Sequence, residues 1–128
     1  MFKLIKKSYT KHLNAQVEKY WNIYHFDMSP NHTSHNNEGD AFKHTYWQAE
    51  MTLWFGKDIA KYMGDMHENK PDNPDNEKVM DLHNNQRGRE IGITTKKHYP
   101  FWFFIEYDDI IAEAVMFLMR EGLLITKC

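Results

Sequence analysis

The amino-acid sequence predicts an all-α fold, a compact single-domain bundle of about five helices that spans residues 1–128. Three observations predict this fold. Apolar residues recur at steps of three and four along most of the chain, and the strict alternation that marks strands is almost absent. Short stretches rich in Pro, Gly and Asn separate the periodic segments. With 128 residues, of which 41% are hydrophobic, the chain has the size of one domain and the composition of a globular protein.

The first predicted helix covers residues 2–24, where apolar side chains recur between lysines. Residues 26–40, which are dense in Asn, Ser, His and Gly, follow as a loop longer than a simple connection requires. The second helix is expected to run from Asp40, as its N-cap, to Phe55, with Gly56 as the stop.

The third helix is expected over residues 57–68, with Asp58 as its cap. After a proline-marked polar break, the fourth helix is expected to start near Glu77 and to end at Gly88 or Gly92. The predicted buried stripe of the third helix consists of Ile59, Tyr62, Met63 and Met66.

The last predicted helix is the most apolar, from about Trp102 to Glu121, and we expect it to be the central core element. The side chains of its predicted stripe are Phe104, Tyr107, Ile111, Val115, Leu118 and Met119.

Composition and charge exclude several classes of protein. The formal net charge is −2, so no strong overall field favours nucleic acid or an anionic membrane. The single cysteine, Cys128, excludes an internal disulfide framework and is consistent with a reducing compartment. No stretch approaches the roughly 20 apolar residues that a transmembrane helix needs, and the first residues lack the apolar core of a Sec signal peptide. We therefore expect a cytoplasmic protein, or one exported without a Sec signal.

Polar residues with low helix propensity recur at three places where apolar residues would suit a bundle better. Asp40 and His44 are four residues apart, so they share one face of the second helix. A His67-Glu68 doublet ends the third helix. The fourth helix carries the remaining cluster, which consists of Asp81, His83, Asn84 and Asn85.

Two interpretations of these clusters stay open. In one, Asp40 is a simple helix cap, the histidines are hydrogen-bonded core residues, and the asparagines join helix ends. In the other, three neighbouring helices direct their polar groups to one point, which is how bundles assemble metal sites. The ligands would then be His44, His67 and Asp81, holding a divalent ion such as zinc or manganese.

Further roles follow from the second interpretation. Asp40 or Glu68 would orient a water or act as general base, and Asp40 with His44 would form an acid–base pair if no metal is bound. The loop histidines His32 and His35, and Asp109 near the start of the last helix, are further candidates for the cluster. The predicted substrate contacts are Lys43, His83, Asn84, Asn85 and Arg87.

The segments GDAFKHTYW, GDMHE and MDLHNNQRGR, in this order between Gly39 and Arg89, resemble a bacterial family with the pattern Gly-Asp-Ala, a basic residue, His and Trp, then His-Glu, then Met-Asp-Leu-His-Asn-Asn. Lys43 stands where that family has arginine. The resemblance implies an exported or toxin-like protein. It also implies a site formed by Asp40, His44, His67, Glu68, Asp81, Asn84 and Asn85.

The order of the site residues is also similar to that of the HD phosphohydrolases, which have a lone His, a His-Asp doublet and a distant Asp. The resemblance would assign these positions to His44, to His67 and to Asp81 or Asp109, with Glu68 in place of the doublet's aspartate.

Together these features favour a small metal-dependent hydrolase that acts on a phosphoester, such as a phospholipid head group or a nucleotide or nucleic-acid phosphate, as a bacterial effector or toxin. The alternatives are a hydrolase of the cell wall, and a non-catalytic module of the inhibitor or immunity type that binds a cognate partner protein.

Overall fold

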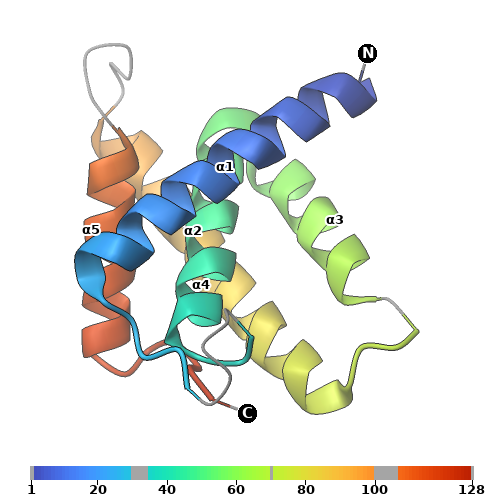
Figure 1. The fold of residues 1–128 in the computed structure, drawn as a ribbon. Coiled ribbons are helices and arrows are strands. Elements are labelled where there is room, and N and C mark those ends of the chain that lie inside the picture. The colour runs from blue at the N-terminus through green and yellow to red at the C-terminus, as the bar shows by residue number, and fades with distance from the viewer. Residues whose placement is uncertain (1, 30–34, 70, 100–106, 128) are drawn as a thin grey trace.

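The computed structural model describes residues 2–29, 35–69, 71–99 and 107–127, and for residues 2–10 it describes the backbone alone. All regular structure in these ranges is helical, which confirms the predicted fold class (Figure 1). The helices are α1 (Phe2–Tyr24), α2 (Glu38–Phe55), α3 (Lys57–Glu68), α4 (Asp75–His98) and α5 (Tyr107–Arg120).

Helix α2 is the central element of the bundle, because it packs against each of the other four helices and most extensively against α4. This position was predicted for the last helix, and that prediction is wrong. The face of α2 toward α1 and α5 is apolar and includes Phe42 and Tyr46, which are fully buried and stacked on each other. The opposite face carries polar side chains that are also buried, among them Asp40, His44 and Gln48. One helix therefore supplies both the hydrophobic core and a buried polar layer.

The N-terminus of α2 differs from the prediction. Asn37 is the N-cap, and its Oδ1 accepts a hydrogen bond from the backbone N–H of Asp40 at 3.1 Å. Asp40 consequently lies in the first turn, with its carboxylate available for other partners. At the next junction Gly56, with a φ of 91°, ends α2 and caps α3, so Asp58 lies inside the first turn rather than at the cap.

Helix α4 is longer than predicted, because it begins at Asp75 and continues through both glycines to His98. At these glycines α4 approaches the backbone of α2 closely. A Cβ on Gly88 would lie 2.3 Å from the backbone oxygen of Thr45, and one on Gly92 would lie 2.6 Å from that of Ala49. Glycine is needed here for close helix packing, and it does not end the helix.

The predicted apolar stripe of α3 is wrong. Ile59, Tyr62 and Met66 are between 46% and 65% exposed, and the buried residues of this helix are Ala60, Gly64 and Glu68. A Cβ on Gly64 would lie 2.7 Å from the Gln48 amide nitrogen, so α3 approaches α2 closely through its small residues. The polar end of α3 thereby reaches the buried polar layer, whereas Met63, the remaining member of the predicted stripe, is half-buried and lines a pocket.

Helix α5 buries Tyr107, Ile111 and Val115 as predicted, and Leu118 and Met119 pack partly buried against the core. The predicted start at Trp102, together with Phe104, lies outside the described residues. Asp109 accepts a 2.6 Å hydrogen bond from the Tyr20 hydroxyl and so joins α5 to α1.

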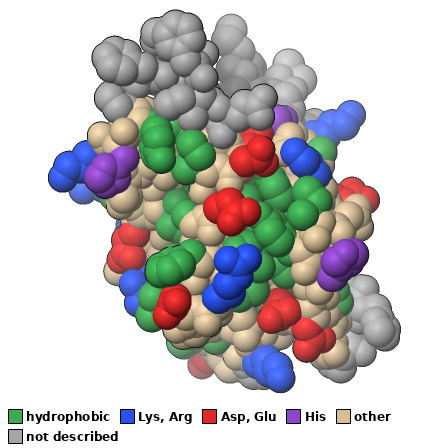
Figure 2. All heavy atoms as spheres, turned by 90° about the vertical axis from the view of Figure 1, so that its left-hand side faces the viewer, with side chains coloured by type: hydrophobic (Ala, Val, Ile, Leu, Met, Phe, Trp, Pro, Cys, Tyr) green, Lys and Arg blue, Asp and Glu red, His purple; other side chains and the backbone are tan. Residues whose placement is uncertain are grey.

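The molecular surface shows no segregation of charge on the face seen in Figure 2, where acidic and basic side chains are interspersed with apolar ones. This agrees with the net charge of −2. Among the described helices, none combines the length and the apolar character that crossing a bilayer requires.

Candidate functional site

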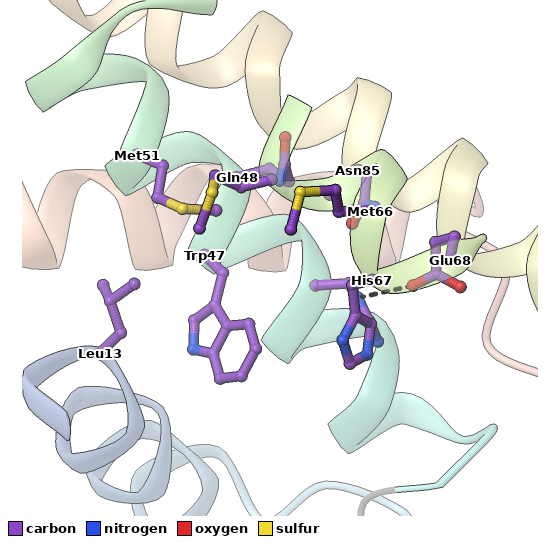
Figure 3. A pocket seen from close by; sticks show the side chains of 11 residues that line it. Leu13, Trp47, Gln48, Met51, Met66, His67, Glu68 and Asn85 are labelled. Atoms are coloured by element: carbon purple, nitrogen blue, oxygen red, sulfur yellow. Dashed lines mark ion pairs between the residues drawn. The ribbon is translucent and has the colours of Figure 1, made fainter. Parts of the chain in front are cut away.

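The site is centred on His44, which is 5% exposed and lies between three carboxylates from three helices. Its Nε2 lies 3.2 Å from Asp40 Oδ1 and 3.5 Å from Asp81 Oδ1. Its Nδ1 lies 3.9 Å from Glu68 Oε1 on the other side of the ring, which is the ion pair drawn as a dashed line in Figure 3. The ring of His67 is beside it, with a centroid separation of 5.9 Å. At least one side chain from each of the three predicted polar clusters therefore lies at His44.

Two loops hold the carboxylates in place. The backbone N–H of Asn36 donates to Asp40 Oδ2 at 2.8 Å, and Lys43 Nζ lies 3.6 Å from the other oxygen of the same carboxylate. Asn73, in the turn between α3 and α4, donates from its side-chain amide to Glu68 Oε2 at 2.9 Å. Asp40 and Glu68 are thus each held by a loop asparagine outside the helix that carries them, and Asp40 also by Lys43 of its own helix.

Two carboxylate oxygens in the site are buried without a hydrogen bond from any residue that the structure describes. These are Glu68 Oε1 and Asp81 Oδ1. An unpartnered buried carboxylate oxygen is costly unless a cation or a donor meets it. Both oxygens face His44, Glu68 Oε1 at Nδ1 and Asp81 Oδ1 at Nε2. With Asp40 as the third carboxylate, the site holds more potential negative charge than one imidazolium can balance.

The ionisable groups perturb one another strongly. Burial, reinforced by the nearby Asp40 and Glu68 carboxylates and opposed by His44, raises the pKa of Asp81 to about 7. Burial acts against ionisation of Asp40 as well, but the hydrogen bond and charge of His44 outweigh it and lower the pKa of Asp40. Burial likewise opposes the charged form of His44, yet the Asp40 hydrogen bond and the Asp81 charge raise the pKa of His44.

Two groups in the described part of the chain could hold a metal ion, and both contain His44. One consists of His44, His67 and Glu68, the other of Asp40, His44 and Asp81, with ligand atoms within 4.8 Å of one another in each. The predicted ligand set of His44, His67 and Asp81 is therefore divided between them.

Two pockets meet at this point. An apolar pocket of about 360 Å³ lies between α1, α2 and α3 (Figure 3). A polar pocket of about 260 Å³ is lined in part by the loop residues His35 and Asn36. His44, His67 and Glu68 line both pockets, whereas Asp40 and Asp81 line the polar one. The site is thus open to a ligand from two sides of different chemistry.

The predicted substrate contacts divide into two sets. Lys43 lines the polar pocket and Asn85 lines the apolar one. By contrast, His83 Nε2 lies 2.8 Å from the backbone oxygen of Leu123, and Arg87 pairs with Glu90 on the surface at 3.3 Å.

Asn84 also serves the fold. Its amide donates to Ile125 O at 2.8 Å and its side-chain oxygen accepts from Ile125 N at 3.0 Å, so it binds the C-terminal segment to α4.

Asn36, Asn73 and Gln48 were not predicted as site residues. Asn36 adopts a φ of 55°, a conformation that asparagine tolerates better than most residues, and this directs its N–H at Asp40. Gln48 donates to Ala60 O and accepts from Arg89, which joins three helices behind the site. The position of Asn36 and Asn73 in the sequence could have indicated their role, because each lies in a polar loop next to a helix that carries site residues.

A family model described as a domain of unknown function, DUF6973, matches residues 6–121. The chain belongs to the DUF6973 family. No solved structure matches it. The matched range contains the whole of α2, α3, α4 and α5, so every residue of the His44 site lies inside the DUF6973 domain.

Proposed function

We propose that this DUF6973 chain is a metal-dependent hydrolase that holds one divalent ion, most simply Zn²⁺, on His44, His67 and Glu68. The observation that carries the proposal is the buried Glu68 Oε1, which has no hydrogen-bond partner among the described residues and faces His44 Nδ1 at 3.9 Å. A carboxylate oxygen of Glu68 also lies within 4.8 Å of a ring nitrogen of His67. Two histidines and one carboxylate form a ligand set of catalytic zinc sites that leaves a position for water or substrate.

The two nitrogens of His44 favour this group over the other. Asp40 Oδ1 lies 3.2 Å from Nε2, so it is placed to accept a hydrogen bond from an N–H at Nε2. In a neutral imidazole with its proton on Nε2, the lone pair is on Nδ1. Nδ1 is the nitrogen that faces Glu68. In metal sites, the ring nitrogen of a histidine that does not bind the metal usually donates its N–H to a carboxylate or another acceptor, which fixes the orientation of the ring. We therefore assign Glu68 rather than Asp81 as the third ligand, and Asp40 as the residue that orients His44.

Within this site a divalent ion would lower the pKa of a bound water to near 7, which allows attack at neutral pH. A phosphoester is the preferred substrate, because Lys43 lines the polar pocket beside the cluster and can meet an anionic phosphate. In the reaction the water oxygen bonds to phosphorus and the bond from phosphorus to the ester oxygen breaks. The departing oxygen takes up a proton, so one water is consumed for each alcohol released.

Elemental analysis of the purified chain, followed by titration of the EDTA-treated protein with Zn²⁺ and Mn²⁺, tests the metal assignment. We expect one ion per chain, lost in His44→Gln and Glu68→Gln and retained in the control His12→Gln, whose side chain is exposed on α1. Asp40→Asn should weaken metal affinity by about 10–100-fold. Full metal binding by both His44→Gln and Glu68→Gln, with circular dichroism unchanged, would refute the ligand set.

Hydrolysis of a chromogenic phosphodiester tests the activity. The metal-loaded chain should be active, and EDTA treatment should remove the activity until metal is restored. Activity that survives EDTA but not His44→Gln would favour the second candidate, an acid–base pair of Asp40 and His44, which the 3.2 Å contact supports. No activity in any form, with growth unaffected when the chain is expressed in bacteria, would favour a non-catalytic binding module over an effector or toxin.

A further inference from the structure

The apolar pocket beside the His44 cluster is larger than a metal site needs. Its volume of about 360 Å³ lies in the range of small-molecule binding sites. One side is formed by Leu13 of α1 and by Trp47 and Met51 of α2, and the other by Met63 and Met66 of α3. Three of these five side chains are methionines, which adapt to flexible apolar ligands.

Most polar groups in the wall of this pocket are gathered at one end or already engaged, and the exception is Trp47 Nε1, which is buried without a hydrogen-bond partner among the described residues. In Figure 3, Leu13 and Met51 lie on the side away from His67 and Glu68. The amide of Gln48 donates to the backbone of Ala60 and accepts from Arg89, so it is not free for a ligand. A ligand that fills the pocket thus meets apolar side chains first and the candidate metal ligands at the other end.

The apolar surface continues out of the pocket onto α3. Met66 lines the pocket and is itself 46% exposed, and Tyr62 and Ile59 follow on the same helix at 65% and 49% exposure. Exposed apolar residues that adjoin an apolar pocket indicate a ligand whose apolar part extends toward the surface. A hydrocarbon chain fits this shape, since it is unbranched, needs no hydrogen bonds and can leave the pocket along α3.

We infer that the substrate is an amphiphilic phosphoester of the phospholipid type, whose hydrocarbon chain occupies the methionine-lined pocket while its phosphate lies at His44 and Lys43. The inference rests on the proposed function, and it adds the substrate class. Because His44, His67 and Glu68 line both pockets, one molecule can place its chain in the apolar pocket and its head group in the polar one.

Calorimetric titration with n-butyl phosphate and n-dodecyl phosphate, both kept below the concentration at which micelles form, tests the inference. The two probes share a head group and differ only in the chain. We expect dodecyl phosphate to bind at least 100-fold more tightly, because each buried methylene contributes up to about fourfold in affinity. Met66→Glu, which places a charge at the pocket mouth, should reduce this ratio at least tenfold. Ile93→Glu is the matched control, since Ile93 is also 46% exposed but lies on α4 and lines neither of the two pockets.

Equal affinities for the two phosphates, or a ratio unchanged in correctly folded Met66→Glu, would overturn the inference. So would displacement of dodecyl phosphate by an apolar dipeptide amide that binds more tightly, because the pocket would then belong to a peptide. The titrations are run with metal-loaded and with EDTA-treated protein. A chain-length ratio that persists in protein without metal or hydrolytic activity would contradict the proposed function alone. A lost ratio in protein that binds metal and hydrolyses the diester would contradict the substrate class alone.

Discussion

Glu50, which lines neither of the pockets at the His44 site, makes the stability of the bundle depend on pH. This residue of α2 is 1% exposed, and its Oε2 accepts a 3.1 Å hydrogen bond from Trp54 Nε1. Burial and the adjacent Asp108 carboxylate on α5 raise the pKa of Glu50 to about 8, against the opposing influence of Tyr46 and Trp54. The folded protein therefore holds a proton on Glu50 at pH values where the unfolded chain has lost it.

The sign and size of the effect follow from linkage. A raised carboxyl pKa gives stability that is fully present below the unfolded value of 4.5 and is lost as pH rises to about 8. Each pKa unit corresponds to about 1.4 kcal/mol, so the loss has an upper limit of about 5 kcal/mol, and we expect about 2–5 kcal/mol. Glu50→Gln imitates the protonated side chain and cannot titrate, so the variant should escape this loss.

Urea denaturation of the wild-type chain and of Glu50→Gln between pH 5 and pH 9 measures the difference directly. The two free energies of unfolding should agree within about 1 kcal/mol at pH 5, and the variant should be the more stable by about 2–5 kcal/mol at pH 9. Other groups that titrate in this range, Asp81 among them, affect both proteins alike and cancel in the difference. Parallel pH profiles for the two proteins would refute the reasoning.

Two further predictions concern packing and hydrogen bonding. Gly88→Ala should destabilise the fold by about 1–3 kcal/mol in urea denaturation, because the added Cβ would lie 2.3 Å from a backbone oxygen of α2. Alanine normally favours a helix over glycine by roughly 1 kcal/mol, so a stabilised variant would disprove this close contact. Tyr20→Phe should cost about 1–2 kcal/mol, since Asp109 loses the donor of a 2.6 Å bond to a buried tyrosine. The control Tyr24→Phe removes an exposed bond to Glu113 and should cost less than about 0.5 kcal/mol; equal costs would contradict the assignment.

The helices themselves were predictable, because their periodicity is a local property of the sequence. Residues 2–24 were predicted as a helix with the bounds that α1 has. The ends of α4 were not predictable, because a glycine that ends a helix and a glycine that allows close contact with another helix look the same in a single sequence. Gly88 and Gly92 are good helix terminators by propensity, yet here they allow contact with the α2 backbone, and only the tertiary partner decides between these uses.

The inward face of α3 was not predictable from periodicity either. Its apolar residues form the clearer stripe, but the helix is placed by the close approach of Gly64 to Gln48 and by burial of Glu68. Burying a carboxylate in preference to tyrosine and methionine opposes the hydrophobic rule, and such exceptions are expected at functional sites.

The convergence of the three polar clusters was a prediction, and the short distances around His44 agree with it. The division of roles within the fourth helix was beyond sequence reasoning. Asn84 and Asn85 are adjacent and chemically identical, but successive helical residues point about 100° apart. One consequently binds the backbone of Ile125 and the other lines the apolar pocket.

The pairing of Asn84 with Ile125 has a consequence for how the protein ages. The side-chain amide offers one donor and one acceptor to a single residue, as a neighbouring peptide group would. Spontaneous deamidation to aspartate would replace the donor by a second acceptor, directed at the carbonyl oxygen of Ile125. The segment around Ile125 would then be repelled from α4. We therefore expect that protein with a mass gain of about one dalton at Asn84, measured by peptide mass spectrometry, loses its C-terminal segment to a protease faster than unmodified protein does.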